Sequence, residues 1–163
     1  MTTRTRVLLT AALLAPLALA QTRNANVFKV DFTIRDSGDA GAKTGRKYSL
    51  VVNDRVKSNF RVGNRVPTPT SDVPGSTSYT YVDVGVNIDC IVVDGDGKIG
   101  MHADIDLSTA VNSDKNPQRA PTISQIKLNI DTTVTPAKPT VVASFDDPVT
   151  ARKFEVEAMV TKM

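Results

Sequence analysis

The side chains best suited to chemistry gather around His102, the only histidine of the chain. Asp104 and Asp106 follow it at intervals of two, so all three share one face if the segment is a strand. A histidine held by a carboxylate could act as a general base. No nucleophile is evident beside it, however, and one histidine excludes a metal site with several histidine ligands. The pattern therefore favours a cross-strand ion pair at the surface.

Aspartates are the second candidate group, because several carboxylates together could hold a hard cation such as calcium. The six positions are Asp83, Asp89, Asp94, Asp96, Asp104 and Asp106. The spacing does not match the twelve-residue calcium loop, since Lys98 stands where a third oxygen ligand is needed. We therefore predict a turn and a solvated face. A weak calcium site of the extracellular type near Asp94 and Asp96 stays open as the alternative.

The remaining candidates have structural explanations. Cys90 is the only cysteine and lies between apolar residues, so we expect it to be a small buried hydrophobe. Gly85 falls on the opposite face of the same apolar stretch, which indicates either a bulge or bend or the close approach of another backbone. The sequence contains no nucleophile elbow, phosphate loop or dinucleotide fingerprint. We predict no catalytic, cofactor-binding or metal-binding residues, and hence no enzyme.

The elements that carry these residues are strands. Apolar residues occupy alternate positions over residues 82–92 and again over residues 99–107. The residues between them, Asp94-Gly95-Asp96-Gly97, are typical of a tight turn. This pattern predicts a long hairpin with one buried face. A four-residue connection between Val93 and Lys98 would set Cys90 opposite Met101 and Asp89 opposite His102. A slip by one residue would turn the apolar side chains to water, so we expect a firm register.

Similar alternation predicts further strands, and turn signals suggest how they connect. Residues 28–34 form a first strand, and the glycine-rich residues 36–45 form a loop. We expect one hairpin with arms at 48–52 and 60–62, and another with arms at 126–134 and 141–145. Residues 63–78, which contain Pro67, Pro69 and Pro74, are predicted to be an extended loop, as are residues 108–121. Residues 154–160 form the last strand.

The fold class follows from this count. About eight mostly antiparallel strands, with no helical stripe and no βαβ unit, predict an all-β domain built from hairpins, either a sandwich or a small barrel. A lone cysteine cannot form an internal disulfide, so stability must come from packing.

The first twenty residues have the features of a secretory signal peptide. Arg4 and Arg6 precede the apolar residues 7–20, and Ala18-Leu19-Ala20 supplies a small-x-small cleavage site before Gln21. Cleavage there would leave residues 21–163 as a single β-domain with no membrane span. It would also leave 18 of the 20 basic residues against 17 acidic ones, so we expect no basic footprint for nucleic acid or anionic lipid on the mature chain. We expect an exported protein, in the periplasm, at the outer envelope or outside the cell.

The order of motifs resembles the C-terminal β-domain of bacterial secretins, over roughly residues 48 to 145. The motifs are Val62-Gly63 with Pro67, the strand 81–88 with Gly85, a glycine turn followed by residues 99–108, and Pro121-Thr122-Ile123 before a last hairpin. The resemblance implies kinship with the outer-membrane pores of type II secretion and type IV pilus systems. Ala143-Ser144 departs from it, because secretins usually carry two glycines there.

Two functions are compatible with these observations. The preferred one is a non-catalytic envelope protein, a short stand-alone derivative of the secretin β-domain, that acts by protein–protein contact with itself or with a secretion or pilus component. The alternative is an independent β-sandwich in the periplasm or outside the cell that binds a small ligand or calcium. Because only about thirty mature residues precede the secretin-like region, we predict a soluble monomer or small oligomer rather than a membrane-embedded ring.

Overall fold

The structure is a computed structural model, and it describes residues 26–38, 45–70, 78–111, 121–148 and 151–163. The predicted signal peptide and the predicted cleavage site lie outside these residues. The described residues form eight strands. They are β1 (Val27–Asp36), β2 (Arg46–Asn53), β3 (Ser58–Pro69), β4 (Tyr79–Asp94), β5 (Ile99–Val111), β6 (Thr122–Val134), β7 (Thr140–Asp146) and β8 (Lys153–Lys162).

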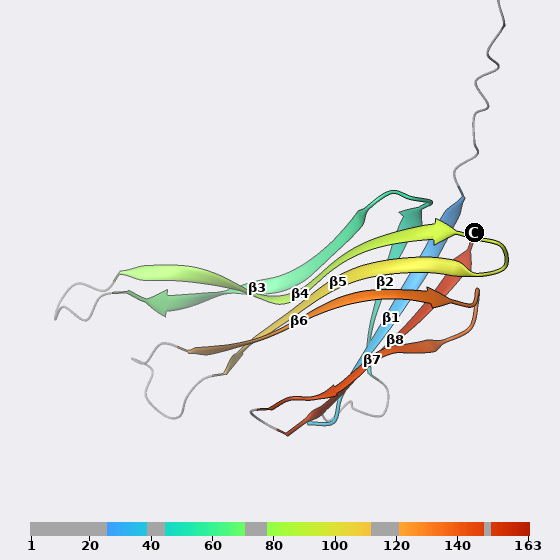
Figure 1. Ribbon diagram of the computed structural model, residues 1–163. Helices are drawn as coiled ribbons and strands as arrows, with labels where there is room; N and C mark the ends of the chain where they lie inside the picture. Colours follow the sequence, from blue (N-terminus) through green and yellow to red (C-terminus); the bar gives the residue numbers. More distant parts are fainter. Residues whose placement is uncertain (1–25, 39–44, 71–77, 112–120, 149–150) are drawn as a thin grey trace, which may run out of the picture.

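The strands form two four-stranded antiparallel sheets that pack face to face (Figure 1). Sheet A has the order β2-β1-β8-β7, and sheet B has the order β3-β4-β5-β6. The predicted all-β class is confirmed, and of its two forms the sandwich is the one observed. Within the described part of the chain, no helix is long and apolar enough to span a bilayer.

The core lies between the sheets and consists of the alternating apolar residues. Phe28 and Phe32 from β1 are fully buried against Ile88 and Ile105 from the long β4–β5 hairpin. The predicted buried faces of these strands are therefore confirmed. Burying each such side chain contributes about 1.5–3 kcal/mol relative to leaving it exposed, which makes this face the main source of stability.

The register of the β4–β5 hairpin differs from the prediction by two residues. Cys90 lies opposite Ala103 and Asp89 lies opposite Asp104, because Asp94 still pairs with Ile99 and the connection is Gly95 to Lys98. The Gly95 N–H donates to the carbonyl oxygen of Lys98 at 3.0 Å, which closes the turn. A shift of two residues preserves the period of the strand, so the buried face is unchanged while every cross-strand pair changes.

Two of the predicted hairpins were wrong. β2 pairs with β1 and β3 pairs with β4, so the turn at Asp54 crosses from sheet A to sheet B instead of closing a hairpin. The Arg55 N–H donates to the carbonyl oxygen of Val92 at 2.7 Å, which anchors this crossing to β4. In the same way β6 and β7 belong to different sheets. Turn residues mark where a chain reverses, but they do not say which sheet it joins.

Two of the three predicted loops contain several strand residues. β3 continues to Pro69 and pairs with β4 as far as Tyr79, whereas the prediction placed residues 63–78 in a loop. Prolines are tolerated here because β3 is the edge strand of its sheet, where a missing N–H can face solvent. Likewise β5 runs to Val111 and β6 begins at Thr122. Residues 39–44, 71–77 and 112–120 lie outside the described residues.

Candidate interaction surface

His102 lies on the outer face of sheet B, where it contacts two carboxylates. Its Nδ1 is 2.7 Å from Asp131 Oδ1 on β6, and its Nε2 is 3.4 Å from Asp104 Oδ2 on its own strand. The hydrogen bond to Asp131, assisted by the charges of both carboxylates, raises the pKa of His102. The predicted surface ion pair is therefore present, but its partner is Asp131 and not Asp89, since the residue opposite His102 on β4 is Ile91.

The aspartates of this face each have a local partner. Asp89 and Asp104 lie directly opposite one another, and such like-charge pairs are unfavourable unless they are neutralised. Lys57 Nζ is 2.8 Å from Asp89 Oδ2, and this contact raises the pKa of Lys57. Asn129 donates to Asp104 at 2.6 Å, which lowers the pKa of that carboxyl. Gln125 donates to Asp106 at 2.8 Å.

Asp94, beside the β4–β5 turn, acts as a structural acceptor. Asp94 accepts hydrogen bonds from Asn26 Nδ2 at 2.7 Å and Lys162 Nζ at 2.9 Å, which ties the turn to the outer ends of β1 and β8. Asp96 is exposed, and Asp83 pairs with Arg65 on β3 at 3.0 Å. Among the residues that the structure describes, no three His, Cys, Asp or Glu side chains converge in a geometry suited to a metal ion.

Cys90 is fully buried in the core. Loss of solvation raises the pKa of its thiol to about 12, so the reactive thiolate form is suppressed at neutral pH. The residue fills space between the sheets as a small apolar side chain, as the sequence predicted.

An unusual backbone geometry lies at Gly85, where β4 and β5 separate. Their pairing ends at Val86 and Leu107, although both strands continue. One position further, the Gly85 N–H donates to Ser108 Oγ at 3.0 Å, and the hydroxyl donates to the Gly85 carbonyl oxygen at 3.4 Å. The side chain of Ser108 thus replaces the backbone groups that a paired strand would offer. We call this point the fork.

Close backbone contact explains why both strands of the neighbouring pair have glycine here. Gly63 on β3 lies opposite Gly85 on β4. A Cβ atom added to Gly63 would stand 2.3 Å from the Val84 carbonyl oxygen, and one added to Gly85 would stand 2.2 Å from that of Val62. Gly85 also has a φ of 150°. Of the two explanations left open by the sequence, the close approach of another backbone is confirmed.

Beyond the fork, β3 and β4 continue as a two-stranded ribbon that projects from the sandwich (Figure 1). We define the ribbon as residues 63–69 and 79–85. Its side chains include Tyr79 and Tyr81, which are 55% and 63% exposed and lie opposite Pro69 and Pro67. Val62, at its base, is 51% exposed. Tyrosine is enriched at protein interfaces because it has an apolar ring and a polar end.

The ribbon also belongs to a sheet with accessible edges. β3 and β6 are the outer strands of sheet B, and β2 and β7 are those of sheet A. Outer strands present backbone donors and acceptors with which another chain can pair. This surface was not predicted from the sequence, because Pro67 and Pro69 indicate a loop. The alternation of Tyr79 and Tyr81 with polar residues was the available signal for a strand.

The fold of this chain, but not its sequence, matches known proteins. No protein-family model matches the sequence, and no curated protein sequence matches it either. Solved structures do match. The InvG secretin domain β-barrel of the Salmonella injectisome aligns with 85% of this chain and 61% of its own, at a TM-score of 0.53 and 10% identity.

Two further solved structures match to a similar degree. A chain of the Klebsiella pneumoniae type II secretion outer-membrane complex, which contains PulD, aligns over 85% of this chain and 39% of its own, with a TM-score of 0.53 and 11% identity. The type IV competence pilus secretin PilQ of V. cholerae aligns over 85% of this chain and 57% of its own, with a TM-score of 0.51 and 7% identity. This chain spans less than two thirds of each of these proteins. Its two-sheet arrangement is the fold of the secretin domain, as the order of sequence motifs had suggested.

Proposed function

We propose that this chain is a non-catalytic protein of the cell envelope that acts by strand-mediated contact with itself or with a component of a secretion or pilus machinery. The observation that carries the proposal is the ribbon, a two-stranded extension of sheet B with exposed Tyr79 and Tyr81 and with exposed Val62 at its base, in a domain with the secretin fold. Strand pairing would supply affinity through backbone hydrogen bonds, and the exposed side chains would supply specificity.

The polar residues support a role without catalysis. His102 forms ion pairs with Asp131 and Asp104. The aspartates of the same face have nearby cationic or amide partners. A general base needs a reacting group within hydrogen-bond reach and a nucleophile or water aligned with it. The arrangement observed here is a network of surface pairs, which stabilises the outer face of sheet B.

Export is part of the proposal. Residues 1–20 act as a signal peptide, and residues 21–163 form a single domain that reaches the periplasm or the outer envelope. Sequencing the N-terminus of the protein recovered from cells tests this step, since cleavage should give a chain that begins at Gln21. Recovery of a chain that begins at Met1 or Thr2 would contradict it.

The contact surface can be tested with a matched pair of substitutions. Val62 at the base of the ribbon is 51% exposed, and Val56, in the crossing between the sheets, is 50% exposed. A lysine at an outer strand blocks strand pairing. Val62→Lys should therefore abolish self-association or capture of a secretion component in light-scattering and cross-linking experiments, whereas Val56→Lys should not. Equal behaviour of the two variants would overturn the proposed surface.

The size of the assembly and the genetic setting provide independent tests. Without detergent, the exported protein should be a monomer or small oligomer by size-exclusion chromatography with light scattering. Genes for secretion or pilus components should lie beside its own gene. An assembly of many subunits that forms only in detergent would instead support a pore.

A further inference from the structure

A cavity of about 320 Å³ lies between the two sheets at the end of the sandwich near the fork. Its walls come from both sheets. Sheet A contributes Ile34, Tyr48 and Phe154, and sheet B contributes Val86, Leu107 and Ile126. In sheet B, Val86 pairs with Leu107 and Leu107 pairs with Ile126, so the three side chains form one apolar row across neighbouring strands.

This row is less well covered than the row next to it on the core side. The next row toward the core contains Ile88 and Ile105, which are 0% and 1% exposed. Val86, Leu107 and Ile126, in contrast, are only half-buried, although they continue the same face of the sheet. The sheets therefore separate before their apolar faces end. Apolar surface left in contact with water at such a site is stabilised by an apolar ligand.

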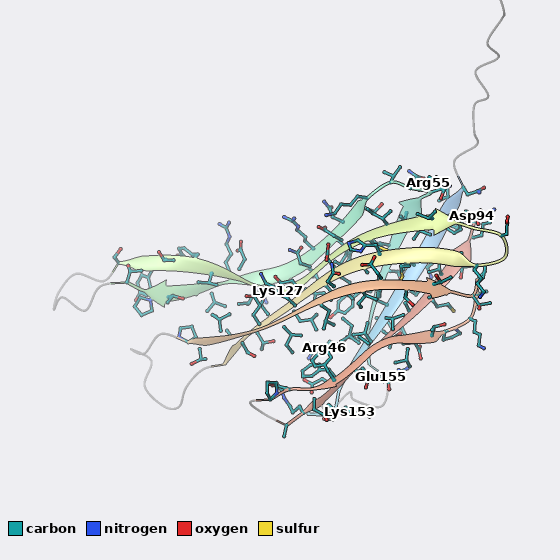
Figure 2. The ribbon with its side chains drawn as sticks, viewed as in Figure 1. Arg46, Arg55, Asp94, Lys127, Lys153 and Glu155 are labelled. Carbon is teal, nitrogen blue, oxygen red and sulfur yellow. The ribbon has the colours of Figure 1, made fainter. Side chains whose placement is uncertain are left out.

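The charged residues of the cavity lie at its rim and are mostly positive. Arg46, at the start of β2, is exposed, and it lies between the two sheets in the view of Figure 2. Arg152, just before β8, pairs with Asp36 at 3.0 Å and stacks 5.7 Å from the ring centroid of Phe154. The charged groups among the described lining residues are these two guanidinium groups and the carboxylate of Asp36. Each guanidinium has five donors, so an existing partner leaves capacity for an anion.

We propose that this cavity binds an amphiphile with one apolar chain and an anionic head. The apolar chain would lie between the row of sheet B and Ile34 and Phe154 of sheet A, and the carboxylate or phosphate head would meet Arg46 and Arg152. The volume lies near the lower end of the range for small-molecule sites, roughly 300–1,000 Å³. It accommodates a single chain, such as that of a fatty acid or an alkyl phosphate, better than a whole phospholipid. The proposal is independent of the ribbon and its partners.

Calorimetric titration of the exported protein with three twelve-carbon probes tests the ligand class. Dodecanoate and dodecyl phosphate, below their micellar concentrations, should bind saturably with one site per chain, and comparison of the two distinguishes a carboxylate source from a phosphate source. Dodecylammonium, which has the same apolar chain, should bind at least about tenfold more weakly, because it loses a charge-assisted hydrogen bond and meets two cations. Absence of binding, or equal affinity for the anionic and cationic probes, would overturn the proposal.

Variants locate the site. Arg46→Ala should weaken dodecanoate binding by about tenfold, whereas Arg55→Ala, at an exposed arginine in the crossing between the sheets, should leave it unchanged. Ser124→Trp, at a half-buried position of the wall, should fill the cavity and abolish binding, with its strand content verified by circular dichroism. Tyr81→Ala, on the ribbon and outside the cavity lining, should retain full binding, which separates this site from the contact surface. An equal effect of Arg46→Ala and Arg55→Ala would show that the anion does not bind at this rim.

Discussion

The hydroxyl of Ser108 satisfies both backbone groups of Gly85, accepting from its N–H at 3.0 Å and donating to its carbonyl oxygen at 3.4 Å. Gly85 is the first residue of β4 beyond the end of its pairing with β5. Without the hydroxyl, a partly buried donor would lack a partner at the point where the ribbon begins. The side chain therefore allows two strands to separate without an unsatisfied backbone group.

The first prediction concerns this contact. Ser108→Ala should lower the free energy of unfolding by about 1–3 kcal/mol, the typical cost of leaving a buried backbone group unsatisfied. Urea titration monitored by circular dichroism measures the change. Ser144→Ala, at an exposed position of β7, should cost less than about 0.5 kcal/mol. Equal stability of the two variants would mean that water replaces the Ser108 hydroxyl at the fork.

The second prediction concerns the glycine pair beside the fork. Gly63→Ala should destabilise the domain by about 1–3 kcal/mol because the new methyl group would collide with the Val84 carbonyl oxygen and force the ribbon to shift. Gly100→Ala is the control, since a Cβ atom there would meet its nearest neighbours at 3.7 Å, an ordinary contact distance. Thermal denaturation should separate the two. A neutral Gly63→Ala would show that β3 can move away from β4 at little cost.

The third prediction tests the buried face of the central hairpin. Ile88 is fully buried, so Ile88→Asp places a charge in the core without a partner and should unfold the domain. Asp89, the next residue, points to the outer face and pairs with Lys57. Asp89→Ala should change stability by less than about 1 kcal/mol, because it removes one partly exposed ion pair and also relieves the repulsion from Asp104. If denaturant titration found both variants mild, the assignment of faces would be wrong.

The faces of the strands could be predicted from the sequence because burial alternates with the period of a strand. Phe28, Ile88 and Ile105 were all placed correctly by this rule. The register was off by two because the glycine turn permits more than one connection of four residues, and such a shift does not alter burial. The residues at a turn do not indicate which distant strand the chain will pair with. Asn53 and Asp54 indicate a turn, but only the packing of the complete sandwich determines that the chain there crosses to the other sheet.

The candidate surfaces were less predictable, for two different reasons. Gly85 carried a usable signal, because a glycine within a strand indicates a bulge or a close backbone. The ribbon was hidden by Pro67 and Pro69, which are acceptable only because β3 is an outer strand, and strand order was unknown. The cavity beside Leu107 could not be predicted at all, since it depends on the separation between two sheets and not on any residue pattern.

The last prediction concerns the pH dependence of stability. The pKa of His102 is raised above 6.5 by its hydrogen bond to Asp131 and by the charge of Asp104. A group with a raised pKa binds protons more strongly in the folded state, so its contribution is fully present below the unfolded pKa and is lost as pH rises through the folded pKa. The melting temperature should therefore fall between mildly acidic and mildly alkaline pH, as the imidazolium that holds the two carboxylates is neutralised.

His102→Gln is the variant that isolates this effect. Glutamine can donate a hydrogen bond to a neighbouring carboxylate but does not titrate, so the variant should lose the decline with pH while keeping most of its stability at alkaline pH. Asp131→Asn provides a second test, because it removes the first cause of the raised pKa and should move the decline to lower pH. The nearby Lys57 does not titrate in this interval, because its contact with Asp89 raises its pKa further above neutrality. If the melting temperature of His102→Gln fell with pH as in the unmodified protein, the pH dependence would belong to a different group. The His102–Asp131 pair would then contribute nothing measurable to stability.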